Sequence, residues 1–188
     1  MHNIEPYYNW IHLYTASNDE RSPFFEKEYS EFMFTDQVYD HLIHPQWNNI
    51  GSPTLFIKIL FADYEEGFCI IEMLGEWNDC IENDIMTLIN EVMEPLQYEG
   101  ITKFIFIGEN LLNFHGSDDE YYMEWDENNP DGWVCLMNFR DHVLEEMKQQ
   151  NIDSYWLWGG ELNCLEWRKL SPPKLKDKVE SVLNKWLN

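Results

Sequence analysis

The sequence predicts a single α/β domain over residues 1–188, in which a mixed sheet is covered by helices. Three observations support this prediction. Two apolar runs rich in β-branched and aromatic residues, 55–62 and 68–74, are joined by a short polar segment, as in a β-hairpin. A helical pattern then separates the second run from a third, 101–107, as in a parallel crossover. A hydrophobic share of 44% and an aromatic share of 16% provide the material for a core.

The N-terminal part is expected to contain short elements. Residues 10–14 favour a short strand. Val38 and Leu42 predict a helix that begins near residues 35–36, where the chain offers good N-cap types. The segment 45–53 is rich in turn-forming residues and predicts a loop.

The first long helix is expected after the hairpin. Asp79 is a candidate N-cap, with Glu82 three residues later as in a capping box. Apolar residues recur at helical spacing over 81–92, and Pro95 should end or kink this helix. The buried strand predicted at 101–107 should then lie parallel to the second strand of the hairpin.

Two further units are expected towards the C-terminus. Residues 132–137 and 154–158 are strand-like, and 139–150 predicts a helix between them. A last helix should open at Ser-Pro-Pro and run from residue 171 to about Leu187. Its apolar face consists of Leu175, Val179, Val182, Leu183 and Trp186.

The charge is unevenly distributed along the chain. There are 35 Asp and Glu against 12 Lys and Arg, and six of these bases lie in the last 21 residues. An acidic body repels phosphate backbones and anionic lipid, so neither nucleic acid nor a membrane is an expected partner. No apolar stretch approaches the ~20 residues that span a bilayer. The expected partners are a basic protein or the chain's own basic C-terminal helix.

The cysteines and the N-terminus favour a cytoplasmic protein. Cys69, Cys80, Cys135 and Cys164 form neither a C-x-x-C pair nor a zinc-ligand pattern. Cys69 and Cys135 lie in apolar runs and are expected to be buried thiols. The first residues lack the basic and apolar regions of a secretion signal. Because no phosphate-binding glycine motif occurs either, no cofactor and no metal are expected.

The order of elements from 54 to 187 resembles that of SpoIIAA and STAS-like domains, in which helices cover a mixed sheet. In regulatory members of that family, a phosphorylated serine begins the helix after the second crossover strand. Here the corresponding segment, 108–112, contains no hydroxyl, and Ser117 comes later, beside Asp118 and Asp119. The resemblance therefore implies the fold and not that switch. Residues 39–140, including LGEWND and IGENLLNFHGSDDEYY, are also similar to bacterial proteins of uncharacterised function, which implies a bacterial cytoplasmic origin.

Polar residues follow the ends of several predicted strands. Ligands of open sheets with parallel strands bind beyond the carboxyl ends of the strands. If these strands are parallel, their ends share one rim. The candidate ligand-binding rim consists of Glu76, Asp79, Glu109, Asn110, His115, Asn138 and Arg140. Asp79 and Asn138 can also be explained as ordinary helix caps.

The segment 113–131 concentrates acidic residues around aromatic ones. It is expected to be a solvated loop or a docking surface for a basic partner. Binding of a divalent cation is the alternative, although the spacing differs from that of a calcium loop. His115 with Glu109 could form a general acid–base pair. His41 and His44 could share a helix face and bind a metal, or serve as capping or surface residues.

These observations predict an acidic cytoplasmic binding or regulatory module without catalytic activity. The alternative is a small enzyme with a carboxylate-rich, metal-assisted site at the strand ends. An enzyme should bring Glu76, Glu109, His115 and Arg140 into one cleft, whereas a module should scatter them over an open surface.

Overall fold

A mixed five-stranded sheet forms the centre of the computed structural model, which describes residues 4–186. The strands lie in the order β3 (Asn48–Asn49), β4 (Leu55–Asp63), β5 (Phe68–Asn78), β6 (Lys103–His115) and β7 (Trp133–Met137). Neighbouring strands from β3 to β5 are antiparallel, and those from β5 to β7 are parallel. This confirms the α/β class, the hairpin, and the parallel pairing of the second and third apolar runs.

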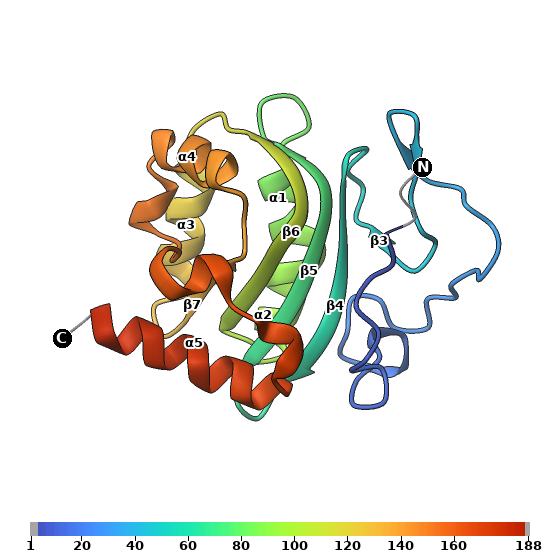
Figure 1. The fold of residues 1–188 in the computed structure, drawn as a ribbon, viewed down its shortest axis with the longest axis horizontal. Coiled ribbons are helices and arrows are strands. Elements are labelled where there is room, and N and C mark those ends of the chain that lie inside the picture. The colour runs from blue at the N-terminus through green and yellow to red at the C-terminus, as the bar shows by residue number, and fades with distance from the viewer. Residues whose placement is uncertain (1–3, 187–188) are drawn as a thin grey trace.

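Helices cover both faces of the sheet (Figure 1). One face carries α1 (Asp84–Leu88), a π-helical turn (Ile89–Met93), α2 (Glu94–Tyr98), α3 (Glu120–Asn128) and α4 (Asp141–Gln149). The long helix α5 (Pro172–Trp186) packs on the opposite face. Among the helices of residues 4–186, none combines the length and apolar character needed to cross a bilayer.

Alternate side chains of β5 belong to two separate core clusters, one on each face of the sheet. Cys69, Ile71 and Met73 belong to the cluster under α1–α4, whereas Phe68 and Ile70 belong to the cluster under α5. Successive side chains of a strand point to opposite faces, and both faces are covered, so the run is apolar throughout. Cys69 and Cys135 are buried as expected.

The central strands are longer than the sequence suggests. β5 and β6 were predicted to end at Leu74 and Ile107, but they continue to Asn78 and His115. Their pairing shifts at two places, next to Gly75 and Gly108. Gly75 has φ +104°, and a Cβ there would overlap the carbonyl of Thr54. These glycines are therefore bulge positions within strands and not strand ends.

The first helix begins later than its apolar pattern predicts. Residues 79–83 form turns, and Ile81 is 78% exposed. Asp79 accepts the backbone N–H of Ile85 at 2.8 Å, but the helix itself starts at Asp84. The π-helical turn directly precedes Pro95, and α2 continues past it to Tyr98. Proline has no N–H for an α-helical hydrogen bond, so the widened turn accommodates it without ending the helix.

Two predictions in the N-terminal part are wrong. Residues 10–14 form turns and no strand, with Trp10 buried against the α5 side of the core. The helix predicted near residues 35–36 is a small antiparallel hairpin of β1 (Gln37–Val38) and β2 (His41–Leu42). Tyr39 has φ +53° in its tight turn, which breaks any helix at this point. The segment 45–53 is a loop apart from the short edge strand β3.

Two further differences occur after β6. The acidic segment 113–131 contains helix α3, because Tyr122 and Trp125 recur three residues apart and are buried against the sheet. Residues 154–158 were predicted to form a strand, but only Leu157 pairs with the sheet, through a single parallel bridge to Cys135. The neighbouring Trp156 and Tyr155 pack into the α1–α4 side of the core instead.

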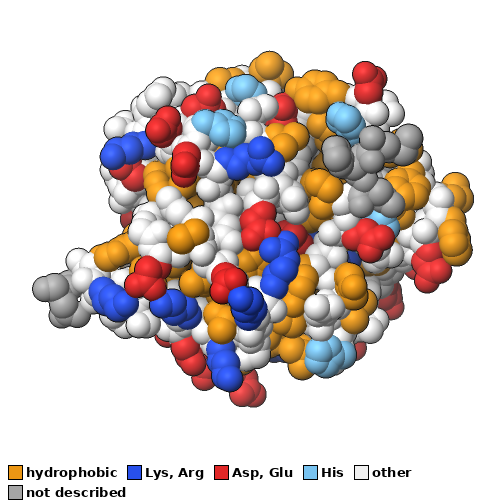
Figure 2. Space-filling model, viewed as in Figure 1, with side chains coloured by type: hydrophobic (Ala, Val, Ile, Leu, Met, Phe, Trp, Pro, Cys, Tyr) orange, Lys and Arg blue, Asp and Glu red, His pale blue; other side chains and the backbone are white. Residues whose placement is uncertain are grey.

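The C-terminal helix packs on the acidic body as predicted. Leu175, Val179 and Val182 are buried. Lys176 lies 2.7 Å from Glu66, and Figure 2 shows basic side chains gathered over α5 beside acidic ones. Trp186, by contrast, is 46% exposed. The predicted end at Leu187 lies outside the described residues.

Candidate functional site

The long parallel strands β5 and β6 bring several rim residues together. Asn113 donates a hydrogen bond of 2.7 Å from Nδ2 to Oε1 of Glu76. The phenol of Tyr39, in the β1–β2 hairpin, donates to the other oxygen of Glu76 at 2.7 Å. Both oxygens of this carboxylate are therefore bound within the chain.

Glu109 has a second set of donors. Its Oε1 accepts from Nδ2 of Asn138 at 2.8 Å and from the indole of Trp167 at 2.9 Å. Its Oε2 lies 2.6 Å from Nη1 of Arg168. Burial alone would raise the pKa of Glu109, but these donors together with the charge of Arg168 lower it below its ordinary value. Glu109 is therefore held as a carboxylate.

Glu72, in β5, lies next to Glu109 and Arg168 and is almost fully buried. Its oxygens accept from the backbone N–H of Tyr7 at 2.8 Å and from Nδ2 of Asn110 at 3.3 Å. Nη2 of Arg168 is 4.0 Å away. Burial raises the pKa of Glu72 to about 7, despite these favourable partners.

We call the resulting feature the polar cluster; it consists of Glu72, Glu76, Glu109, Asn110, Asn113, Asn138 and Arg168. Its two central carboxyl groups, on Glu72 and Glu109, have pKa values shifted in opposite directions, the condition for one group to give a proton and the other to accept one. Yet Glu72 exposes only 1% of its surface. The carboxyl groups of the polar cluster are held by donors from within the chain.

The structure places Asp79 away from the polar cluster. Its Oδ1 accepts from the indole of Trp77 and the N–H of Ile85, both at 2.8 Å, and its Oδ2 accepts from the phenol of Tyr122 at 2.6 Å. Burial raises the pKa of Asp79 to about 6. This residue joins α3 to the end of β5 inside the core.

The remaining two rim residues lie at the surface. His115 is exposed at the end of β6. Arg140 is also exposed and lines a cavity of about 430 Å³ under the β1–β2 hairpin, together with Asn110 and Leu74. In the described chain, no hydrogen bond or ion pair joins His115 to Glu109. The rim is therefore only partly assembled, around Glu109 and Asn138.

Neither of the two alternative metal sites, at His41 with His44 or in the acidic segment 113–131, is assembled in the described residues. His41 and His44 both line the cavity under the hairpin, but on an extended segment and not on one helix face. Nε2 of His44 lies 3.7 Å from a carboxylate oxygen of Glu5. Within residues 4–186, no group of three or more His, Cys, Asp or Glu side chains is arranged to hold a metal ion.

The helices α1–α4 present a strongly acidic surface, which we call the acidic layer. Eight acidic side chains on these helices and the π-helical turn are exposed: Glu91, Glu94, Glu120, Glu124, Asp126, Glu127, Asp141 and Glu145. In the described part of the chain, none of them forms an ion pair. Burial and the neighbouring charge of Glu127 raise the pKa of Asp126. The like charges of this surface are therefore uncompensated.

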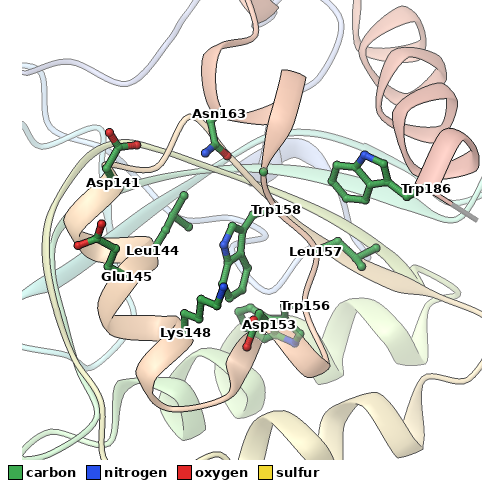
Figure 3. Close-up of a pocket in the computed structure, with 11 residues that line it drawn as sticks. Asp141, Leu144, Glu145, Lys148, Asp153, Trp156, Leu157, Trp158, Asn163 and Trp186 are labelled. Carbon is green, nitrogen blue, oxygen red and sulfur yellow. The ribbon is translucent and has the colours of Figure 1, made fainter.

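A cleft of about 590 Å³ lies at one end of the acidic layer, between α4 and the end of α5 (Figure 3). We call it the aromatic cleft. Figure 3 shows Trp158 between α4 on one side and Trp186 on the other. The lining residues are Asp141, Leu144, Glu145, Lys148, Asp153, Trp156, Leu157, Trp158, Gly159, Asn163 and Trp186.

Comparison with protein-family models, with curated protein sequences and with solved structures finds no match for this chain.

Sequence reasoning missed Glu72, Arg168 and the aromatic cleft. A signal for Glu72 was present, because an acid within the apolar run FCIIEML must find partners when the strand is buried. The cleft had a weaker signal. Trp156 and Trp158 alternate as in a strand, and only the loop that replaces this strand turns Trp158 towards α4.

Proposed function

We propose that this protein is a non-catalytic binding module that recognises a basic protein through its acidic layer. The observation that carries the proposal is that the acids of the acidic layer lack ion pairs, whereas acids elsewhere on the surface have them. Among residues 4–186, seven Lys and Arg side chains form ion pairs, all with acids outside α1–α4 and the π-helical turn: Arg21, Lys103, Arg168, Lys169, Lys176, Lys178 and Lys185. The acidic layer contains eight exposed acids and a single base, Lys148.

Electrostatics favour a cationic partner at this surface. With a formal net charge of −23, the chain repels itself and other anions, and a basic protein relieves that repulsion where it binds. Complementary charge also speeds diffusional encounter, and the gain falls as salt is added. Most of the basic charge of the C-terminal helix is already engaged, because Lys176, Lys178 and Lys185 contact Glu66, Glu161 and Glu180 on other parts of the surface.

The polar cluster supports the non-catalytic part of the proposal. Its two most central carboxylates, Glu72 and Glu109, accept hydrogen bonds from the chain's own donors, and the N-terminal segment at Tyr7 covers Glu72. Such a cluster fixes the segment at Tyr7 and the segment around Arg168 to the sheet.

The test uses a fluorescein-labelled octalysine peptide and fluorescence anisotropy at several salt concentrations. One variant neutralises four acids of α3: Glu120→Gln, Glu124→Gln, Asp126→Asn and Glu127→Gln. We expect this variant to bind octalysine at least about tenfold more weakly, because each removed charge takes away part of the attraction. The affinity of the unaltered chain should fall steadily with salt.

A control variant removes the same number of charges elsewhere, through Glu20→Gln, Glu28→Gln, Glu31→Gln and Asp40→Asn. These four acids are exposed in the N-terminal part of the chain. The control should change the affinity by less than about threefold. Equal losses in both variants would show that binding follows total charge, and absence of binding would contradict the proposal altogether.

One observation favours an enzyme as the second candidate. The pKa of Glu72 is raised to about 7, whereas that of Glu109, which shares Arg168 with it, is lowered. Such a pair can exchange protons with a substrate near neutral pH. For a metal-assisted reaction, titration calorimetry with Mg²⁺ and Mn²⁺ should show binding that Glu109→Gln abolishes. Identical heats in both proteins would count against that form of the enzyme.

We also propose a bacterial cytoplasmic location and a STAS-like arrangement of the fold. Four cysteines without disulfides suit a reducing compartment.

The order of a hairpin followed by two parallel crossovers supports the STAS-like layout. An experimental structure whose strand order superposes on a SpoIIAA-type sheet would test the second point.

A further inference from the structure

We propose that the aromatic cleft binds an arginine side chain of the basic partner. This inference rests on the proposed function and adds to it a specific contact. The cleft adjoins the acidic layer, because Asp141 and Glu145 of α4 belong to both. A partner seated on the layer would therefore place its side chains within reach of the cleft.

The walls of the cleft suit a planar cation. Trp158 is half-buried and Trp186 is 46% exposed, so each offers part of an indole to solvent. A guanidinium group stacks on indole faces, and tryptophan gives the strongest cation–π attraction of the aromatic side chains. Figure 3 shows the Trp186 side chain extending from α5 towards the Trp158 side of the cleft.

The charge of the lining points to the same ligand. It contains three acids, Asp141, Glu145 and Asp153, and one base, Lys148. Asp141 and Glu145 are four residues apart on α4 and thus lie on one helix face. Two neighbouring carboxylates can accept several of the five N–H donors of a guanidinium group.

Two lining groups also lack the partners that buried polar atoms normally have. Nε1 of Trp156 and Oδ1 of Asn163 are buried, and in the described chain neither makes a hydrogen bond. Trp156 as a whole is only 1% exposed. An unpaired carbonyl oxygen such as that of Asn163 suits a guanidinium N–H.

The experiment compares two blocked peptides, acetyl-Gly-Arg-Gly-amide and the same peptide with citrulline in place of arginine. Citrulline has nearly the same shape but no charge. Indole N–H signals in ¹H–¹⁵N spectra are assigned from Trp→Phe variants and followed during titration. We expect the arginine peptide to shift the signals of Trp158 and Trp186, and the citrulline peptide to leave them unchanged.

Three variants sharpen the test. Trp186→Ala, at an exposed position, should weaken arginine binding about fivefold. Glu145→Gln should weaken it about threefold, and Lys148→Gln should strengthen it about twofold, because these changes act on the cation with opposite signs. The matched control is Glu31→Gln, which removes the same charge from an exposed site outside both the cleft and the acidic layer.

Equal shifts with both peptides would overturn the inference, as would equal affinities for Glu145→Gln and Glu31→Gln. If octalysine still binds the unaltered chain in that case and the α3 variant still weakens it, the proposed function stands and only the cleft is refuted. If octalysine also fails to bind, the basic partner itself is refuted.

Discussion

The phenol of Tyr122 donates a hydrogen bond of 2.6 Å to Oδ2 of Asp79 in the interior of the protein. The other oxygen of this carboxylate accepts from Trp77 and Ile85. Asp79 thus connects α3, β5 and α1 at one point. Its position explains why an acid expected at the rim is a structural residue, and it leads to the first prediction.

Replacing Asp79 with alanine should lower the free energy of unfolding by roughly 3–5 kcal/mol, since three donors lose their acceptor at about 1–3 kcal/mol each. Asp79→Asn should cost less than about 1.5 kcal/mol, because the amide oxygen can still serve Trp77 and Ile85 and its NH₂ can donate to Tyr122. Urea unfolding at pH 7 measures both. Equal losses in the two variants would contradict this role.

Glu72 should make the protein less stable as pH rises. Its pKa is raised from 4.5 to about 7, so the folded state holds the proton more tightly than the unfolded state does. The stability of the unaltered chain relative to Glu72→Gln should therefore fall between about pH 4.5 and 7, by roughly 2–3 kcal/mol. Urea unfolding at half-unit pH steps measures the difference, and a flat difference would refute the assignment.

Glu109→Gln is the matched control, because the pKa of Glu109 is lowered in the folded state. Its contribution to stability is present above its unfolded pKa and is lost as pH falls. The difference between the unaltered chain and Glu109→Gln should therefore grow as pH rises from about 3 to 5. The two variants must differ in the sign of their pH dependence, although both replace a glutamate beside Arg168.

Ile89→Asp should destabilise the fold by about 3 kcal/mol or more, because it places an unpaired charge in the core. Ile89 is 8% exposed and packs under the sheet from the π-helical turn. Asn90→Asp introduces the same side chain at the next, exposed position and should change stability by less than about 1 kcal/mol. Thermal unfolding compares them. Similar melting temperatures would show that this turn does not face the core.

Burial, more than charge, should hold α5 in place. Leu175→Ala should cost about 2–4 kcal/mol, since the side chain is fully buried against the sheet. Lys178→Ala should cost less than about 1 kcal/mol, because its ion pair with Glu161 is exposed to solvent. Urea unfolding in 0.1 M and 1 M NaCl separates the two effects. A large loss for Lys178→Ala at low salt alone would reverse the order of importance.

The sequence by itself determined four of the five strands of the central sheet and the last helix. The runs 55–62, 68–74, 101–107 and 132–137 are strands because a buried sheet needs apolar side chains on both faces, and this need is visible in any short window. The strand lengths were not visible in this way. Gly75 lies against Thr54, and Gly108 lies against Phe139, so whether each glycine ends or bends a strand depends on a distant neighbour.

The candidate site was likewise predictable from the sequence only in part. The rule for parallel strands placed Glu109 and Asn138 together, and the structure joins them by a hydrogen bond. The partners of Glu72, by contrast, come from the N-terminus and from Arg168, which no local pattern connects to β5.

Net charge follows from composition alone, so the sequence determined that the protein is acidic. Which acids remain unpaired was decided only by the tertiary structure. The lysines of α5 reach only carboxylates near the face on which that helix packs, and its buried leucines and valines select that face. The acidic layer on α1–α4 keeps its full charge because the chain's only concentrated source of bases is fixed to the other side of the sheet.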